Sequence, residues 1–583
     1  MTRPMQLYRQ IEQRFRSNPA VIKIILVGSL VCIAFVLRLW GLDNGLPFAQ
    51  MPDESADITT SLQIASGKQP TYLYHRVGWP IFQLPVHALH FVVKAVTTPG
   101  FGLRDFQDHF FRNRWAFIYS ARLLVALLSS LSIIFAFGLG RVLCDDDRGG
   151  YVMALLFCGH AWFNYITHTA LPDGFAFSWI IVALFASAMI AKTGQRWAYL
   201  LAGASVAVVT LARLQAFTIF IPIGLAHIIF WFRSRERTLA LLLTRWIWSF
   251  SAFIVVQILL NPFILLNFPG VVADVQSITS QYNSDSLTSS IQYALQNFPF
   301  PIILARPYVL AAAVIGLGCA IVRRNWAVLS IATFGIIFAT TIIGRRYPTP
   351  NFFLPFAAPS LALAGFGLAN LVASPQRAVR LFGFGALSLI LTLGFTESIQ
   401  VSQILARPNT RIAAYIWISQ NIKAGARILI GEPVAYSVPL FRTEESIRRM
   451  TTDTPVSISP SMEWQLTAPP IKEPAFNLYG YEYQTQITDE RSLINFVKTH
   501  NIEYIIEADY CAGGYSFSSG SSIEFPVIPT DYRKGLTLEA VFSPFAQPDC
   551  AEHVPERLHL QRMNLNIWNS VGPVIRIYRV QQN

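Results

Sequence analysis

The sequence predicts a polytopic α-helical membrane protein with about eleven transmembrane helices and a C-terminal extracytoplasmic α/β domain. The chain of 583 residues is 53% hydrophobic and 13% charged, whereas soluble domains carry about 25% charged residues. Apolar runs of about 20 residues, the length that crosses a bilayer, recur through residues 20–397. Residues 398–583 are more polar and alternate helix-like with strand-like segments.

The first apolar run, VIKIILVGSLVCIAFVLRLW, follows a basic N-terminus without a small-residue cleavage pattern. Residues 1–19 are therefore predicted to be a cytoplasmic N-terminus ahead of an uncleaved anchor. Ten further spans are expected near residues 117–140, 150–167, 174–191, 197–212, 215–232, 246–266, 303–322, 326–344, 352–373 and 379–397. Together they form one predicted transmembrane domain, residues 20–397.

The net charge of +12 lies in the apolar part of the chain. Of the 45 Lys and Arg, 16 lie after residue 397, where 18 of the 33 Asp and Glu also lie. The excess falls in short links between apolar runs, as the positive-inside rule predicts for cytoplasmic loops, and forms no basic stripe with interleaved aromatics. The pattern argues against nucleic acid as a partner. It predicts a multi-pass protein of the cell inner (plasma) membrane, with residues 41–116 and 398–583 on the extracytoplasmic (periplasmic) side.

The tail predicts two helix-then-strand units. TRIAAYIWISQNIKAG is followed by RILIG, SLINFVKTHN is followed by IEYIIEA, and VIRIYRV closes the chain as a strand. The chain contains neither a GxGxxG motif nor a P-loop. Cys511 and Cys550 both belong to this tail, and an extracytoplasmic location permits a disulfide between them without requiring one.

The segment PDES, residues 52–55, places acids shortly after the first span. Pro52 is well suited to begin a helix, with Asp53 and Glu54 in the first turn at the favourable end of the helix dipole. Acids at a helix start need no further role. The same loop, however, offers His75, Arg76 and Trp79, and an acid beside the membrane near cations is what transfer from a lipid-bound phosphate requires.

Four stretches in order resemble a known family. They are RLWGLDNGLPFAQMPDES after span one, YSARLLVALLSSLSIIFAFGLGRVL at span two, HTALPDGFAFSW at span four and GRRYPTPNFFLPFAAPSLALAG at a late span. The set is similar to the GT-C superfamily of membrane glycosyltransferases, specifically the bacterial protein O-mannosyltransferase and aminoarabinose transferase group (glycosyltransferase families 39 and 83). Many relatives carry a Lys-Pro-Pro-Leu element in the first loop, where this chain has HRVGWPIF, with Pro80 and no lysine.

The resemblance implies an inverting transfer of a sugar from a polyprenyl-phosphate donor to an extracytoplasmic acceptor, which is a lipid, a glycan or a protein. Asp53 would be the general base, Glu54 would support it, and Asp173 of the LPDG element would be a second acid in the same cavity. A helix-start role for Asp173 remains open. Asp57, one turn after Asp53, is expected to be a solvated helix residue.

Cations must hold the donor phosphate as its negative charge grows. The candidates are His75, Arg76, Arg213, Arg345 and Arg346. Of these, His75 or Arg76 would replace the missing lysine. Arg213 lies in an otherwise apolar run, where a cation is costly without a partner, although it could also reach the membrane surface. The acids at 53, 54 and 173 could bind a divalent ion, but the resemblance implies no required metal and none is assigned.

Two other functions fit parts of the pattern. A transporter or flippase for lipid-linked saccharides would predict inverted repeats and helices broken in matching halves, and the sequence shows neither convincingly. A non-catalytic envelope scaffold would leave the acids at 53 and 173 and the cation at 213 without a reason.

Overall fold

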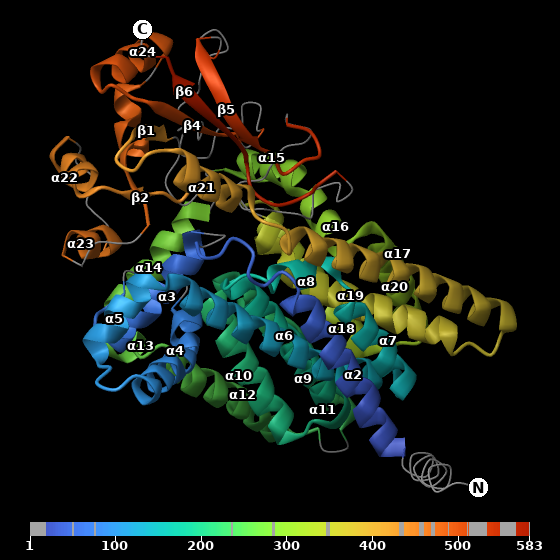
Figure 1. Ribbon diagram of the computed structural model, residues 1–583. Helices are drawn as coiled ribbons and strands as arrows, with labels where there is room; N and C mark the ends of the chain where they lie inside the picture. The colour runs from blue at the N-terminus through green and yellow to red at the C-terminus, as the bar shows by residue number, and fades with distance from the viewer. Residues whose placement is uncertain are drawn as a thin grey trace, which may run out of the picture. The chain divides into compact units, whose positions relative to one another are not determined.

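The structure of the chain is a computed structural model (Figure 1). It describes residues 19–48, 52–70, 72–74, 77–234, 237–282, 286–345, 350–430, 437–453, 460–467, 473–487, 489–509, 511, 533, 535–548 and 567–581. The chain divides into two compact units. Unit 1 comprises Met1–Trp40, Thr59–Val86 and Ala121–Ser402, and unit 2 comprises Gly41–Ile58, His87–Ser120 and Gln403–Asn583.

Unit 1 is helical, and its helices are mostly apolar. In chain order the helices of the transmembrane region are α2 (Pro19–Leu39), α3 (Pro52–Ala65), α4 (Gly78–Thr97), α5 (Leu103–Arg112), α6 (Arg114–Cys144), α7 (Asp147–Cys158), α8 (Ala161–Ile166), α9 (Pro172–Thr193), α10 (Arg196–Ala212), η1 (Leu214–Ile219), α11 (Phe220–Arg233), α12 (Leu239–Leu260), α13 (Phe263–Leu266), α14 (Phe268–Tyr282), α15 (Leu287–Asn297), α16 (Pro299–Ala305), α17 (Pro307–Val322), α18 (Trp326–Ile343), η2 (Pro350–Phe353), α19 (Leu354–Val372) and α20 (Arg377–Leu405). Helix α5 lies wholly in unit 2, and α3, α4, α6 and α20 continue into it.

Within the described part of the chain, eight helices are long and apolar enough to cross a membrane, and nine if one bent pair is counted as a span. The protein is therefore a multi-pass membrane protein. These eight correspond to eight of the eleven segments expected from the sequence, which are residues 21–40, 117–140, 174–191, 215–232, 246–266, 326–344, 352–373 and 379–397. The other three expected spans differ in length or continuity.

Residues 150–167 do not form one helix. Helix α7 ends at Cys158, and α8 begins after His160, whose Nδ1 accepts a hydrogen bond of 3.3 Å from the backbone N–H of Phe163. A Cβ on Gly159 would lie 2.9 Å from the ring of Phe395, so the chain turns here where another helix approaches closely. Residues 197–212 form a single helix, α10, of only 17 residues.

The expected span at 303–322 contains a sharp bend. The helical stretch Thr288–Ala305 and the helix Pro307–Val322 meet at 87°. Between them Arg306 has a φ of 67°, a backbone conformation that is unfavourable for an arginine. Pro307 also removes one backbone donor at the junction, which favours a break in the helix.

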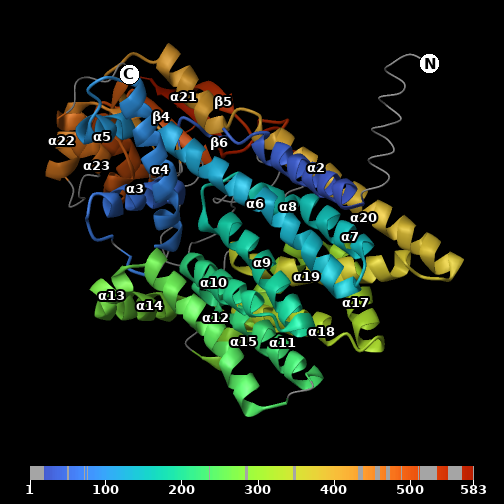
Figure 2. The same ribbon diagram turned by 90° about the horizontal axis from the view of Figure 1, so that it is seen from below.

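Small residues let the helices of unit 1 pack closely. Helix α10 lies between α9 and α12 (Figures 1 and 2). Helices α17 and α19 meet at Gly316, where an added Cβ would collide with the backbone carbonyl of Leu363. Small residues at such crossings are typical of membrane helices, because association there depends on close van der Waals packing.

Unit 2 contains a six-stranded sheet in the order β2-β3-β1-β4-β6-β5. The strands are β1 (Arg427–Ile430), β2 (Phe441–Arg442), β3 (Ala475–Tyr479), β4 (Tyr504–Asp509), β5 (Leu536–Phe542) and β6 (Val574–Val580). The helices of this part are α21 (Thr410–Asn421), α22 (Glu444–Asp453), α23 (Pro460–Thr467), η3 (Tyr481–Gln486) and α24 (Glu490–Thr499). Strands β1 to β4 pair in parallel, while β6 is antiparallel to β4 and β5.

Helices cover both faces of this sheet (Figure 1). Because side chains alternate along a strand, Ile428 and Ile430 of β1 pack in one core with Ile418 of α21. Leu429 faces the other core with Phe496 of α24. The predicted C-terminal α/β domain is confirmed, and all five of its predicted helices and strands are present.

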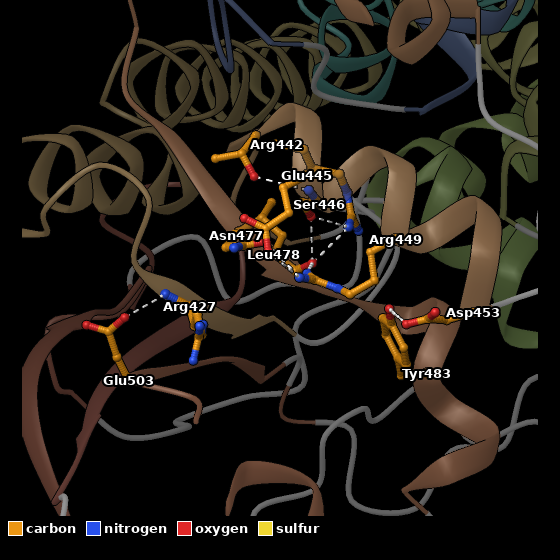
Figure 3. Close-up of polar contacts among 11 residues, drawn as sticks. Arg427, Arg442, Glu445, Ser446, Arg449, Asp453, Asn477, Leu478, Tyr483 and Glu503 are labelled. Atoms are coloured by element: carbon orange, nitrogen blue, oxygen red, sulfur yellow. Dashed lines mark hydrogen bonds and ion pairs between the residues drawn. The ribbon is translucent and has the colours of Figure 1, made fainter. Parts of the chain in front are cut away.

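A polar network fixes α22 against the sheet (Figure 3). The Arg442 guanidinium donates to the carbonyl of Leu478 at 3.0 Å and forms a 2.7 Å ion pair with Glu482. Ser446 donates to the same carbonyl at 2.8 Å, and Arg449 donates to the Asn477 side chain at 2.9 Å. The network uses buried charged groups for packing within the domain.

Cys511 is disulfide-bonded. Four other cysteines are free thiols, namely Cys32, Cys144, Cys158 and Cys319. Cys550, the partner that the sequence permits for Cys511, lies outside the residues that the structure describes.

Candidate active site

The acidic motif begins helix α3 as the sequence predicts. The helix starts at Pro52, and Asp53 and Glu54 lie in its first turn. Asp53 is half-buried, whereas Glu54 is fully buried. Asp57 is only 4% exposed, so the expectation of a solvated residue is wrong. It fails because residue 57 shares a helix face with Glu54, Ile58 and Ser61, and the packing around α3 buries that face.

Asp173 and Arg213 form a buried ion pair in unit 1. Asp173 is in the first turn of α9 and is 1% exposed. Arg213 has extended backbone geometry between α10 and η1, which directs the chain out of the helix at this residue. Its Nε donates to Oδ1 of Asp173 at 2.6 Å, and its Nη2 contacts the same oxygen. Both residues were candidates from the sequence, but their binding to each other was not predicted.

This pair borders a small cavity. The cavity of about 10 Å³, room for about one water molecule, is lined by Asp173, Arg213, Gln215, Phe352 and Pro355 among others. The Arg213 guanidinium lies 5.2 Å from the centre of the Phe352 ring, a cation–π distance. The side chain of Arg213 is 17% exposed. The arginine is therefore held by a carboxylate and an aromatic ring, and it keeps a small exposed surface.

His75 and Arg76 lie outside the described residues, but the segments on either side are anchored in unit 1. The backbone N–H groups of Leu73 and Tyr74 donate to Oδ2 of Asp274 at 3.1 and 2.8 Å. On the other side, the indole N–H of the fully buried Trp79 donates to the carbonyl of Ala170 at 2.7 Å. The two anchors hold this part of the first loop to α14 and to the segment that precedes α9.

Arg345 lies two residues after the end of helix α18 and is half-buried. Its Nε donates to the carbonyl of Thr341 at 3.2 Å, and its own carbonyl accepts a 3.2 Å hydrogen bond from Asn297. Arg346 lies outside the described residues.

A second charged group in unit 1 was not predicted from the sequence. Arg306 at the α16–α17 bend lies 2.9 Å from Glu397 of α20, and the Tyr308 hydroxyl donates to the same carboxylate oxygen at 3.0 Å. Glu397 lies within an otherwise apolar run, LTLGFTESIQ. An acid in such a run is a signal that points to a partner or a function, and it could have identified this group.

Arg38 near the end of α2 was also missed. Its side chain is fully buried, and its Nη1 donates to the carbonyl of Ala34 at 2.8 Å. Its Nε and Nη2 make no hydrogen bond within the part of the chain that the structure describes. The guanidinium lies 4.6 Å from the centre of the Phe163 ring, a contact that compensates for part of the cost of burying the charge.

Among the described residues, no three His, Cys, Asp or Glu side chains gather as the ligands of a metal ion would. Of the candidate residues described in unit 1, Asp173 and Arg213 bind each other directly. Asp53 and Glu54 belong to unit 2.

Comparisons with known proteins give a likeness of structure. No family model matches the chain, and no curated protein matches its sequence. The apo oligosaccharyltransferase of Archaeoglobus fulgidus is 9% identical, with a TM-score of 0.44 over 84% of this chain and 70% of that chain. ArnT from Cupriavidus metallidurans is 14% identical in two structures. The TM-score is 0.44 for the apo state, over 84% of this chain and 93% of that chain. It is 0.42 for the complex with undecaprenyl phosphate, over 83% of this chain and 93% of that chain.

Proposed function

We propose that this chain is an inverting glycosyltransferase that moves a sugar from a polyprenyl-phosphate carrier to an acceptor on the extracytoplasmic side of the membrane. The acceptor hydroxyl oxygen forms a new bond to the anomeric carbon. The bond from that carbon to the phosphate oxygen breaks, and the electron pair leaves with the polyprenyl phosphate. The acceptor proton passes to a carboxylate, so the step needs one base and several cations.

The observation that carries this proposal is the burial of the three acids at the start of α3. The carboxylates of Asp53, Glu54 and Asp57 lie within five consecutive residues of the chain, shortly after the apolar helix α2. Glu54 and Asp57 are buried, whereas Asp53 keeps part of its surface exposed. A partly exposed carboxylate between buried neighbours suits a general base, which must reach an incoming hydroxyl while holding its position.

Arg213 is proposed to bind the donor phosphate, with Asp173 as its positioning partner. A guanidinium presents several donors in a fixed plane and suits phosphate oxygens. The Asp173 carboxylate binds Nε and Nη2 of Arg213 and so fixes the orientation of the guanidinium plane. Nη1 of Arg213 takes no part in this ion pair. In this proposal Asp173 acts on the phosphate site through Arg213 instead of accepting the acceptor proton.

The proposed phosphate site also includes His75, Arg76, Arg345 and Arg346. The first two lie in a part of the loop whose flanks are anchored to unit 1 by Asp274 and Trp79. The positive charge that they add would stabilise the leaving phosphate. No metal is required for this chemistry as proposed, because the arginines and the histidine supply the charge.

A comparison of cells with and without the gene tests the function whichever sugar is transferred. We expect deletion to remove one sugar substituent from one class of envelope lipid, glycan or protein, as seen by mass spectrometry. The corresponding polyprenyl-phosphate sugar should accumulate, because its consumption stops. An unchanged set of envelope sugars and lipid-linked donors, with the intact gene expressed in the control, would contradict the proposal.

The orientation of the protein in the inner membrane gives a separate prediction. The proposal places residues 1–19 in the cytoplasm, 20–397 in the membrane domain and 398–583 outside. An alkaline phosphatase fused after residue 583 is therefore expected to be active, because this reporter folds only in an oxidising compartment. The matched control is the same reporter fused after Arg323, in the link between α17 and α18, which is expected to be inactive. An inactive fusion after residue 583 together with an active fusion after Arg323 would show that the orientation is the opposite one.

A further inference from the structure

Unit 2 contains a large cavity that the mechanism above does not use. Its volume is about 460 Å³, within the range of about 300–1,000 Å³ that is typical of ligand pockets. Its walls come from the segment that follows α2, the α5–α6 junction, α21, the segment that leads into β2, and α23. Every lining residue belongs to unit 2. The cavity is thus a feature of this unit alone.

The lining of this cavity is strongly cationic. It includes one glutamate, Glu473, and the four arginines Arg112, Arg114, Arg411 and Arg442. Arg442 is ion-paired with Glu482, which does not line the cavity, and its buried Nε makes no hydrogen bond within the described ranges. Arg112, Arg114 and Arg411 add three further guanidinium groups to a lining that has one carboxylate. A cavity with this balance favours an anionic ligand.

Aromatic side chains form the other part of the wall. Trp464 of α23 stacks on Phe111 with ring centres 5.4 Å apart, and its indole N–H donates to Asp108 at 2.9 Å. The guanidinium of Arg112 lies 5.3 Å from the centre of the Trp464 ring. Trp115 also lines the cavity and is 45% exposed. Flat rings beside fixed polar groups suit the alternating apolar and hydroxylated faces of a sugar.

The cavity reaches the turn that carries the proposed base. Ser55 lines it, and Ser55 is two residues after Asp53 in the first turn of α3. A ligand in this cavity would therefore lie beside the segment where the acceptor hydroxyl must lose its proton. The arginines of the lining are also less suited to the polyprenyl chain of the donor than to a polar acceptor.

We infer that this cavity binds the acceptor through an acidic sugar, one that carries a carboxylate or a phosphate group. The inference rests on the proposed function for the role of the ligand as acceptor. The arginines bind the acid group and the aromatic rings bind the sugar face. The occupant is a saccharide, and the headgroup of an anionic membrane lipid is the competing occupant that the test must separate from it.

The test measures binding to the intact protein in nanodiscs of zwitterionic lipid. The probes are trigalacturonic acid, maltotriose phosphate and neutral maltotriose, with isothermal titration calorimetry as the readout. We expect at least one acidic probe to bind about tenfold or more tightly than maltotriose, the effect of one charge-assisted hydrogen bond. The comparison of maltotriose phosphate with trigalacturonic acid shows whether the site prefers a phosphate or a carboxylate group. The affinity should fall with added salt, because the lining charges are partly exposed.

The variant Arg112→Gln removes an exposed guanidinium of the lining and should lower the affinity for the acidic probe about tenfold. Arg112→Lys keeps the positive charge and should keep part of that affinity. The matched control Arg448→Gln changes an exposed arginine of α22 that does not line the cavity and should leave binding unchanged. Equal affinity for acidic and neutral probes, or equal loss in the two glutamine variants, would overturn the inference. Loss of saccharide binding when anionic lipid is added to the nanodiscs would overturn it too, in favour of a lipid headgroup.

Donor turnover separates this inference from the proposed function. If the protein cleaves a polyprenyl-phosphate sugar but binds saccharides without regard to charge, the inference alone fails. If it binds acidic saccharides at Arg112 but consumes no lipid-linked donor, the proposed function fails and the site stands as a binding site for acidic sugars.

Discussion

Replacement of Asp53 by asparagine is expected to lower the rate of sugar transfer about 10²-fold or more. Asparagine keeps the size and most of the hydrogen bonding of aspartate but removes the basic oxygen, and a positioned proton acceptor contributes about 10²–10⁴-fold. Binding of polyprenyl phosphate and the folded yield should change little, because the phosphate is held elsewhere. The measurement is the transfer rate at saturating donor, with the thermal stability of the same preparation.

The matched control for this substitution is Asp43→Asn. Asp43 is an exposed carboxylate of the same segment of unit 2, and its replacement should leave transfer near the wild-type rate. If Asp53 only begins a helix, asparagine is also an acceptable residue there and should cost at most about 1 kcal/mol of stability. A near-normal rate in the Asp53→Asn variant would remove Asp53 from the role of base.

The second large effect is expected at the buried pair of Asp173 and Arg213. Removal of one partner of such a pair leaves an uncompensated charge and costs about 3–5 kcal/mol, whereas replacement of both by apolar residues of similar volume is often neutral. Asp173→Leu and Arg213→Met should therefore each lower the melting temperature strongly. The double variant should recover most of the loss, since it buries no unpaired charge.

The same three variants separate a structural role from a functional one. If Arg213 holds the donor phosphate, the double variant should recover its stability and still bind polyprenyl phosphate about tenfold or more weakly than the wild type. Recovery of both stability and donor affinity in the double variant would show that the pair serves only the fold. Melting temperature and polyprenyl-phosphate affinity are the two measurements.

The elements that the sequence predicted correctly are those whose signals are local. Pro52 fixes the start of α3 because proline suits the first turn of a helix. Helix α21 and strand β1 follow from helical spacing, a stop at Gly425 with φ of 83°, and an apolar run. Strand β2 was not predicted, because it is two residues long and depends on its pairing with β3.

The breaks in the helices were not predictable in the same way. The stretch 150–167 is as apolar as a span, yet it turns at Gly159, next to Phe395 of a helix more than 200 residues later. The bend at Arg306 likewise lies against Glu397. Hydropathy measures the composition of one segment and contains no information about which distant side chain will lie against it.

The candidate active site also depends on contacts between distant residues that local sequence signals do not contain. Asp173 and Arg213 were each identified as charged residues in apolar surroundings, which is a local signal. Their pairing depends on α9 and α10 packing side by side, which sets the relation between residues 40 positions apart. The burial of Asp57 also followed from packing around α3 and not from the sequence of the helix itself.

The lipid product of the reaction offers the sharpest test of the proposed transfer. The intact protein in nanodiscs is incubated with a panel of polyprenyl-phosphate sugars and an envelope extract as acceptor, and free polyprenyl phosphate is quantified by mass spectrometry. We expect the wild type to release polyprenyl phosphate in step with the sugar gained by the acceptor, and the new linkage to have the inverted anomeric configuration. The Asp53→Asn variant should do neither. Transfer with retained configuration, or transfer from a nucleotide sugar with no polyprenyl phosphate released, would contradict the proposed reaction.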